Sequence, residues 1–306
     1  MDLSVVTVSY NTRELLRECL ASVFSTLSSA ALDYEVLVVD NASSDDSPAM
    51  VSEAFPEARL IANPENRGFA AASNQGLQQS GGRCVILLNP DTVVKPGALE
   101  LMRGALEAQS DVGAVGPKLI YPHGGLQHSA FTFPTLAMVF LDIFPLHHRL
   151  LDSQLNGRYP RAWYEGKDPF PIDHPLGAAL MTKRAVVDEV GLLDERFYMY
   201  CEEIDWCMRI KKAGWTILCV PQAEIVHHVA QSTKQLGPQM YVELHKSRYG
   251  LYEKHYSRGF QRVARWIVRL GMAWQEARDR RQAKKGLLDG AALESRLNAY
   301  REIRAL

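Results

Sequence analysis

Val36-Leu37-Val38-Val39-Asp40-Asn41 is a short apolar run that ends in polar residues. Two further runs have the same form: Val5 to Val8 precedes Ser9-Tyr10-Asn11, and Val85 to Leu88 precedes Asn89-Pro90-Asp91. Short Val-rich runs separated by helical patterns are typical of buried parallel strands. Ligands of such sheets bind beyond the carboxyl ends of the strands, so we expect these polar residues to meet in one crevice.

Helical patterns separate these runs. Asn11 or Thr12 can cap an amphipathic helix after the first run, and Ser43 begins a polar stretch that can cap a second helix. Residues 68–79 give a third helix, and Pro96 suits the first turn of a fourth. The strand-helix repeat predicts an α/β fold with a mostly parallel, twisted sheet flanked by helices.

The composition is that of a globular protein with a large core. The chain has 306 residues, of which 47% are hydrophobic, and its net charge is −1. No apolar run reaches the roughly 18 residues that span a bilayer, and the first strand starts too early for a secretion signal. The five cysteines, which lack the paired spacing of metal ligands, are Cys19, Cys84, Cys201, Cys207 and Cys219. We therefore predict a cytoplasmic protein with reduced cysteines in its core.

The C-terminal segment is basic and helical. One predicted helix face carries Val263, Trp266, Ile267, Leu270 and Trp274, and another carries Arg262, Arg265 and Arg269. A basic amphipathic helix with Trp is typical of an anchor on a membrane surface with anionic lipids. A helix packed on the rest of the chain, or across a homo-oligomer, explains the same pattern. Nucleic acid fits less well, because no groove-reading motif accompanies the charge.

Two aspartates end two of the predicted strands. Asn89-Pro90-Asp91 has the spacing of two ligands flanking one residue, and a carboxylate there could hold a hard divalent cation together with substrate phosphates. Asp is also a routine helix cap, so Asp40 and Asp91 could simply start the helices that follow them. The motif alone leaves both interpretations open.

A stretch rich in small residues lies between the two aspartates: Asn66-Arg67-Gly68-Phe69-Ala70-Ala71-Ala72-Ser73-Asn74-Gln75-Gly76. Small residues at a helix start allow a ligand close to the backbone, and helix N-termini favour anions, so a nucleotide could bind there. A turn followed by a closely packed helix explains the same residues without a ligand.

A second acidic group, Glu202-Glu203-Ile204-Asp205, follows the aromatic run from Phe197 to Tyr200. A carboxylate beside such a pocket wall can act as a general base. The helix dipole and an i,i+4 pair of Asp205 with Arg209 explain the acids without catalysis. His227-His228, after a predicted strand, could ligate a metal or contact a phosphate, or could be structural.

Six short motifs occur in one order along the chain. They are Val8-Ser9-Tyr10-Asn11, Val39-Asp40-Asn41-Ala42-Ser43, Asn66-Arg67-Gly68-Phe69, Leu88-Asn89-Pro90-Asp91, Gly177-Ala178-Ala179 and Glu202-Glu203-Ile204-Asp205. Their order and spacing resemble those of the inverting family-2 glycosyltransferases, above all the rhamnosyltransferase-like branch that builds bacterial surface polysaccharide. The resemblance covers about residues 3 to 255.

The resemblance implies a GT-A fold, which is a Rossmann-like, mostly parallel twisted sheet flanked by helices. It places a nucleotide-sugar-binding half at residues 1–120 and an acceptor-binding and catalytic half at residues 121–235. The remaining residues, 236–306, would form a helical basic C-terminal arm.

The resemblance also implies how the donor is bound. The nucleotide-binding residues would be Ser9, Tyr10, Asn11, Asp40, Asn66, Arg67, Asn74 and Asn89. Asp91 would bind Mg²⁺ or Mn²⁺, with His227 or His228 at the metal and the diphosphate. Asn89 stands where the family's Asp-x-Asp motif has its first aspartate, which lowers the local negative charge.

The implied catalytic base is Glu203, which matches the family's Glu-Asp-x-Asp motif with glutamate in place of the usual aspartate. Asp205 would support it or replace it, and Gly177, Glu202 and Trp206 would line the donor and acceptor pocket. The implied reaction is one in-line displacement, in which Glu203 takes the proton of an acceptor hydroxyl as it attacks the anomeric carbon with inversion.

The implied donor is a nucleotide-diphospho sugar, with dTDP-rhamnose as our prediction, and the implied acceptor is a glycan or lipid-linked molecule of surface polysaccharide synthesis. The protein would work in the cytoplasm, peripheral to the inner face of the cell membrane. A non-catalytic nucleotide-binding scaffold and a nucleotidyltransferase stay open. Asp91 together with Glu203 favours the glycosyltransferase, and Ser9-Tyr10-Asn11-Thr12 is no glycine-rich phosphate loop.

Overall fold

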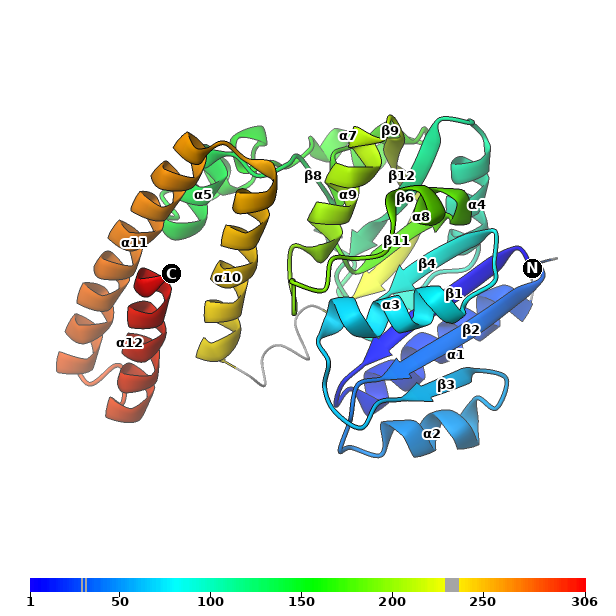
Figure 1. Ribbon diagram of the computed structural model, residues 1–306, viewed down its shortest axis with the longest axis horizontal. Coiled ribbons are helices and arrows are strands. Elements are labelled where there is room, and N and C mark those ends of the chain that lie inside the picture. Colours follow the sequence, from blue (N-terminus) through cyan, green and yellow to red (C-terminus); the bar gives the residue numbers. More distant parts are fainter. Residues whose placement is uncertain (29, 31, 229–236) are drawn as a thin grey trace. The chain divides into compact units, whose positions relative to one another are not determined.

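The chain forms two compact units in the computed structural model, which describes residues 1–28, 30, 32–228 and 237–306 (Figure 1). Unit 1 comprises residues 1–133, 159–198 and 202–232, and unit 2 comprises residues 134–158, 199–201 and 233–306. The sequence places 134–158 in the catalytic half, whereas the structure groups them with the C-terminal helices. The predicted boundary at 235/236 lies outside the described residues.

Unit 1 is built on a ten-stranded sheet. Its strands are β1 (Leu3–Ser9), β2 (Tyr34–Asp40), β3 (Arg59–Ala62), β4 (Cys84–Leu88), β5 (Thr92–Val94), β6 (Val112–Ile120), β7 (Leu126–Gln127), β9 (Phe170–Pro171), β11 (Ala179–Lys183) and β12 (Thr216–His227). The main path is β3-β2-β1-β4-β11-β6-β12-β5, with β7 on β6 and β9 on β12. The first four strands of this path are parallel, and β11 runs antiparallel to both of its neighbours.

Helices cover both faces of this sheet, which confirms the predicted α/β fold (Figure 1). They are α1 (Arg13–Ser28), α2 (Ser47–Ala54), α3 (Phe69–Gln79), α4 (Ala98–Glu107), α7 (Arg161–Glu165), α8 (Arg184–Val190) and α9 (Glu202–Lys212). Val5 belongs to the apolar cluster on the side of α1 and α4, and its neighbour Val6 to the cluster that contains Trp206 of α9. Because both faces are covered, every residue of β1 is buried.

Glycine allows two close approaches around α3. Gly68, which precedes the helix, has a φ of +82°, and a Cβ there would lie 2.6 Å from the Tyr198 carbonyl oxygen. Gly76 lies directly against the Val6 side chain. The small residues of this stretch therefore serve close packing, as one of the two sequence interpretations proposed.

The segment from Tyr121 to Pro175 contains short elements. They are β7, β8 (Ala130–Phe131), α5 (Leu136–Ile143), α6 (His148–Leu151), a 3-10 turn (Gln154–Asn156), α7, β9 and β10 (His174–Pro175). The elements β8 and β10 pair in unit 1, whereas α5, α6 and the 3-10 turn belong to unit 2.

Unit 2 joins α5 to the C-terminal helices α10 (Pro238–His255), α11 (Arg258–Lys284) and α12 (Gly290–Ala305) (Figure 1). Gly271 of α11 lies against Ile143 of α5, so these helices approach closely. Asp279 of α11 is fully buried and accepts a hydrogen bond from Tyr300 Oη of α12 at 2.9 Å. The predicted helical C-terminal arm is thus confirmed. All five cysteines of the chain are buried thiols.

Candidate active site

The three motif strands end at the same edge of the sheet. Ser9 of β1 pairs with Asp40 of β2, and β1 pairs in parallel with β4 on its other side. Strands two positions apart are about 10 Å apart, so Asp40 and the residues that follow β4 share one edge of unit 1. The structure therefore brings the nucleotide and metal motifs together as the sequence predicts.

Asp40 is a buried carboxylate with one vacant hydrogen-bonding position. It is 2% exposed, and its Oδ2 accepts a hydrogen bond from the Ser43 amide at 2.9 Å. In the described part of the chain, its buried Oδ1 has no hydrogen-bond partner. A buried acceptor without a donor is costly, and an N–H or O–H group of a ligand would satisfy it.

Ser9 and Asn11 shape the turn after β1. Ser9 Oγ and Thr12 Oγ1 lie 3.0 Å apart, and the Thr12 carbonyl accepts the first amide bond of α1, so Thr12 rather than Asn11 starts the helix. Asn11 has a positive φ of 53°, and its Oδ1 accepts a hydrogen bond from the Ser44 amide at 2.7 Å. Tyr10, between them, is partly exposed.

Asn41, which the sequence analysis did not select as a site residue, organises the neighbouring loop. Its Nδ2 donates to Asn66 Oδ1 at 2.8 Å, and its Oδ1 accepts from the Arg67 amide at 3.1 Å. Asn66 Oδ1 also accepts from the Gly68 amide at 3.0 Å. Asn66 is thereby fixed beside Asp40, while the Arg67 side chain is exposed.

Asn74 does not contribute to this edge. Its Oδ1 accepts from the Leu193 amide at 3.0 Å, and its Nδ2 donates to the Leu193 carbonyl at 2.9 Å and to Glu195 Oε1 at 3.0 Å. Both ends of the buried amide are therefore used to hold residues 193–195 on α3. We exclude Asn74 from the proposed nucleotide pocket.

Asp91 is paired with His227 and not with His228. The distance from Asp91 Oδ1 to His227 Nε2 is 3.4 Å, and both side chains are nearly buried. The distance from His227 Nδ1 to the side-chain amide nitrogen of Gln127 is 3.0 Å. His228 donates its backbone amide to the Asp91 carbonyl at 2.9 Å, and its ring lies 3.9 Å from the exposed Glu18. Gln127 is 100 residues from His227, so no local pattern could have indicated it.

Glu203 lies against Gly177. A Cβ at residue 177 would be 3.4 Å from the Glu203 Cδ, which is van der Waals contact with the carboxyl group. The next residue, Ala178, accepts a hydrogen bond from the Asn89 amide at 2.9 Å. The predicted base therefore contacts Gly177, and the residue after Gly177 is hydrogen-bonded to the first residue of the Asn89-Pro90-Asp91 motif.

Glu202 is the buried member of the glutamate pair. It is 5% exposed, and its Oε2 has no hydrogen-bond partner among the described residues. Burial raises the pKa of Glu202 well above its usual value, and the Glu203 charge raises it further. Burial and the neighbouring carboxylate therefore both favour the neutral form of Glu202.

Asp205 and Trp206 have structural contacts. Asp205 is fully buried and accepts from Arg209 Nε at 2.9 Å, while Arg209 also donates to the carbonyls of Val190 and Leu192. Trp206 is fully buried and donates from Nε1 to the Gly191 carbonyl at 2.9 Å. These contacts are what the structural interpretation of Asp205 expects and they place Trp206 in the core, while a role of Asp205 in the chemistry stays a prediction.

Four of the five non-glycine residues with positive φ in the described part of the chain lie next to the motifs. Asn11 and Ala42 follow β1 and β2, and Tyr200 and Cys201 directly precede α9. Such conformations cost of order 1–3 kcal/mol each and persist where the surrounding structure imposes them, often at functional sites.

Asp91 and His227 suit a divalent cation that also binds a diphosphate. Among the described residues, no group of three or more His, Cys, Asp and Glu side chains is arranged to hold a metal. Mg²⁺ commonly takes one or two carboxylates and completes its shell with water and substrate phosphates. The near-buried contact of Asp91 Oδ1 with His227 Nε2 needs a proton or a cation between the two atoms, so the pair fits such an ion.

The comparisons with known proteins agree with this geometry. The family model described as "Glycosyl transferase family 2" matches residues 4–164. The N-acetylglucosaminyl-diphospho-decaprenol L-rhamnosyltransferase of Mycobacterium tuberculosis is 30% identical over 292 residues, which covers 89% of this chain and 90% of that protein. The low-salt glycan biosynthesis hexosyltransferase Agl10 of Haloferax volcanii is 24% identical, and the match covers 86% of this chain and 79% of that protein.

Solved glycosyltransferases share the fold. The mannosyltransferase PcManGT of Pyrobaculum calidifontis, in complex with GDP-Man and Mn²⁺, has a TM-score of 0.56 at 17% identity and covers 99% of this chain and 85% of that one. GalNAc-T7 with UDP, GalNAc and Mn²⁺ has a TM-score of 0.58 at 17% identity and covers 74% of this chain and 43% of that one.

Proposed function

Because the chain belongs to glycosyl transferase family 2, we propose that it is an inverting, metal-dependent glycosyltransferase that transfers rhamnose from dTDP-rhamnose to a lipid-linked glycan acceptor. The observation that carries the proposal is the link between Glu203, Gly177 and the Asn89-Pro90-Asp91 motif. A base and a diphosphate site this close are what an in-line sugar transfer requires. A nucleotide-binding scaffold has no need of the base.

Glu203 is the proposed base. Glu203 is partly exposed, whereas burial raises the pKa of Glu202 and favours its neutral form, so we assign the role of accepting the proton of an acceptor hydroxyl to Glu203. That hydroxyl then attacks the anomeric carbon on the face opposite the diphosphate, which inverts the configuration. Gly177 leaves the Glu203 carboxylate open to the acceptor.

Asp40 supports the nucleotide proposal. Its buried Oδ1 can accept the N–H of a thymine or uracil base, or a ribose hydroxyl. Asn66 and the backbone before α3 lie beside it, where the Asn41 contacts hold them. The choice of rhamnose rests on the similarity to the mycobacterial rhamnosyltransferase.

Asp91 and His227 would hold the Mg²⁺ or Mn²⁺ ion. When bound, the ion neutralises the negative charge that develops on the leaving diphosphate. Gln127 fixes the orientation of the His227 ring from its Nδ1 side, which leaves Nε2 directed at Asp91.

The acceptor proposal follows from the mycobacterial relative, whose name specifies a diphospho-decaprenol. A lipid-linked acceptor places the reaction at the inner face of the cell membrane. We propose peripheral association there, because the proposed acceptor is lipid-linked. None of the helices in the described ranges is both long and apolar enough to cross a bilayer.

The test is calorimetric titration with dTDP, UDP and GDP, each with and without Mn²⁺, followed by a transfer assay with the matching nucleotide sugars. We expect Mn²⁺-dependent binding of dTDP and release of dTDP from dTDP-rhamnose when acceptor is present. Nucleotide binding without transfer to any acceptor would indicate the scaffold, and formation of a nucleotide sugar from a sugar phosphate would indicate the nucleotidyltransferase. Selective binding of UDP or GDP would mean that the donor is a UDP-sugar or a GDP-sugar instead of dTDP-rhamnose, and the proposed glycosyl transfer would stand.

A further inference from the structure

The outer side of α11 carries a stripe of exposed apolar side chains. Trp266 is 63% exposed, and Val263, Leu270 and Trp274 are each more than 40% exposed. Their spacing places them on one helix face over three turns. Ile267, which the sequence assigns to the same face, is 7% exposed because it turns toward the interior of unit 2. A helix of a globular protein normally packs such a stripe against the core, whereas the stripe of α11 is exposed.

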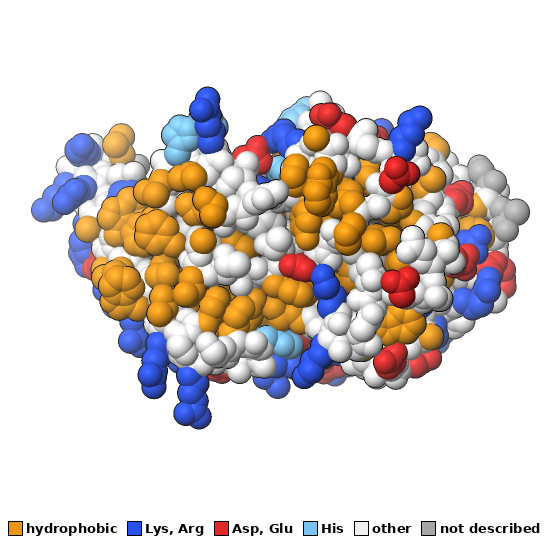
Figure 2. All heavy atoms as spheres, turned by 90° about the horizontal axis from the view of Figure 1, so that it is seen from above, with side chains coloured by type: hydrophobic (Ala, Val, Ile, Leu, Met, Phe, Trp, Pro, Cys, Tyr) orange, Lys and Arg blue, Asp and Glu red, His pale blue; other side chains and the backbone are white. Residues whose placement is uncertain are grey.

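The stripe continues onto α5. The rings of Trp274 and Phe144 are 5.7 Å apart, and those of Phe144 and Phe140 are 5.0 Å apart. Phe140 and Leu146 are themselves exposed. Figure 2 shows hydrophobic side chains gathered over the part of the surface that belongs to unit 2, with Lys and Arg side chains around them. We call the six exposed residues Phe140, Leu146, Val263, Trp266, Leu270 and Trp274 the apolar face.

Cations border the apolar face. From Arg258 to Lys285 the sequence has nine Lys and Arg residues and two acidic residues. The acidic ones, Glu276 and Asp279, pair with arginines. The cations that form no ion pair in the described part of the chain include Arg262, Arg269, Arg281, Lys284 and Lys285. The border is therefore open to anions.

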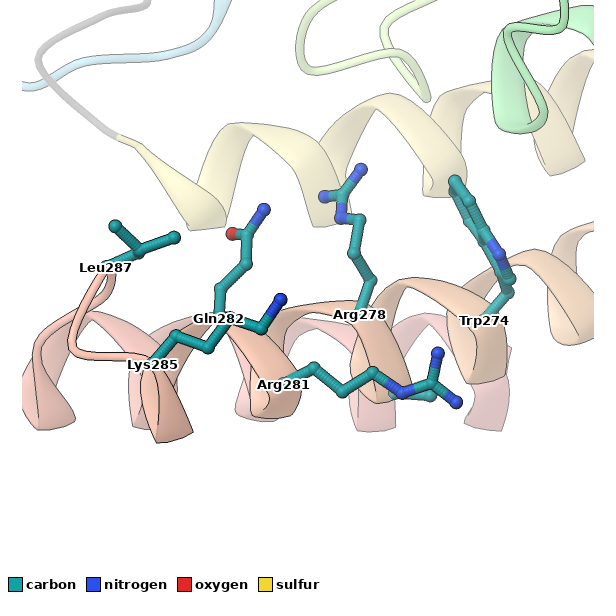
Figure 3. Close-up of a pocket in the computed structure, with 7 residues that line it drawn as sticks. Trp274, Arg278, Arg281, Gln282, Lys285 and Leu287 are labelled. Carbon is teal, nitrogen blue, oxygen red and sulfur yellow. The ribbon is translucent and has the colours of Figure 1, made fainter.

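A pocket lies where the apolar face meets these cations. It has a volume of about 460 Å³ and is lined by Trp274, Ala277, Arg278, Arg281, Gln282, Lys285 and Leu287. Figure 3 shows Trp274, Arg278 and Gln282 projecting from the same side of α11. The Arg278 guanidinium lies 5.4 Å from the centre of the Trp274 ring. Three cations beside a Trp and an exposed Leu suit a phosphate with an attached acyl chain.

We propose that the apolar face docks the protein on a bilayer that contains anionic phospholipids, and that the pocket at Arg278, Arg281 and Lys285 takes a lipid phosphate. Trp and Phe side chains prefer the membrane interface, and the unpaired cations are attracted to its negative surface. A second copy of the chain fits this face less well. A two-fold contact would place unpaired arginines of both copies together, and no acidic residue of the face would compensate them.

The docking itself does not depend on the transfer reaction, whereas its purpose, bringing the protein to a lipid-linked acceptor, rests on the proposed function. The test is sedimentation of the full chain with vesicles of phosphatidylcholine alone and of phosphatidylcholine with phosphatidylglycerol. We expect binding to the anionic vesicles that weakens with salt. Arg281→Gln with Lys285→Gln should weaken it about 25-fold, since each cation near the surface contributes about fivefold. Trp266→Ala should weaken it roughly tenfold.

Matched controls are Lys167→Gln with Lys212→Gln and Trp163→Ala, which alter exposed cations and an exposed Trp of unit 1. They should bind vesicles like the unaltered protein. Equal binding to neutral and anionic vesicles, or no binding to either, would overturn the proposal. So would a dimer in solution that the Trp266→Ala change dissociates. Turnover with a soluble acceptor separates the two proposals, because the docking variants should keep it and loss of the transferase function should not affect vesicle binding.

Discussion

The active-site edge of unit 1 and the outer face of α11 in unit 2 differ in how their polar groups are paired. At the edge, Asp91, Asn66 and Asn41 are each held by a second side chain or a backbone amide. On α11, Arg262 and Arg269 have no ion-pair partner in the described residues and stand beside exposed Trp side chains. Catalysis needs groups fixed before the substrate arrives, whereas attachment to a fluid surface needs charges left available.

The largest effect should come from Glu203→Gln. Removing the base should lower turnover by roughly 10³-fold, because proton transfer to a positioned side chain contributes a factor of this order. Nucleotide binding should stay unchanged, since Glu203 lies on the Gly177 side of the motif. Turnover and calorimetry measure the two quantities separately.

The control for this change is Glu202→Gln, which alters the neighbouring carboxyl. Because burial raises the pKa of Glu202 and so favours its neutral form, an amide there should leave turnover within about fivefold of the unaltered protein. A large loss with Glu202→Gln and a small one with Glu203→Gln would exchange the roles of the two residues.

Asp205→Asn tests whether the other acid of α9 is structural. It should lower the free energy of unfolding by about 3 kcal/mol, because the fully buried carboxylate is the charged partner of Arg209. Chemical denaturation measures this loss. Glu107→Gln is the matched control, since it breaks the exposed i,i+4 pair with Arg103 and should cost about 0.5 kcal/mol or less. Full stability with lost turnover in Asp205→Asn would instead place Asp205 in the chemistry.

The sequence predicts those features of the active-site edge that follow from local sequence patterns. The apolar runs before Asp40 and Asp91 specify buried strands, and parallel pairing then brings their polar ends to one edge. The choice of His227 over His228 needs the register of β12 against β5, in which His227 faces Thr92, beside Asp91. A one-residue shift would reverse the two histidines, and the sequence does not fix that register.

Contacts between distant segments account for what the sequence did not predict. Asn74 looks like a nucleotide ligand until Leu193 and Glu195 are known to lie against it. Ile267 lies at the margin of the apolar stripe, and helical periodicity cannot decide whether a marginal residue turns inward. Packing against α5 decides it, and α5 belongs to a segment without a clear periodic pattern.

The buried glutamate gives unit 1 a pH dependence that Glu202→Gln should remove. The raised pKa of Glu202 means that the folded protein keeps a proton that the unfolded chain loses above about pH 4.5. Its contribution is therefore favourable at low pH and declines as the pH rises toward the folded pKa, by up to about 1.4 kcal/mol per pH unit. Denaturation at several pH values should show a smaller decline for the variant. Equal slopes for the two proteins would mean that Glu202 is ionised when folded.

The smallest effect should come from Trp266→Ala on α11. An exposed side chain without a cover contributes little to folding, so the free energy of unfolding should change by less than about 0.5 kcal/mol. Met272→Ala, on the buried side of the same helix, should cost about 2 kcal/mol or more, because it leaves a cavity. Denaturation of both variants in vesicle-free buffer compares the two faces directly. A loss for Trp266→Ala as large as for Met272→Ala would mean that the apolar face is covered in solution. The face would then be an interface of the folded protein, and its contrast with the active-site edge would disappear.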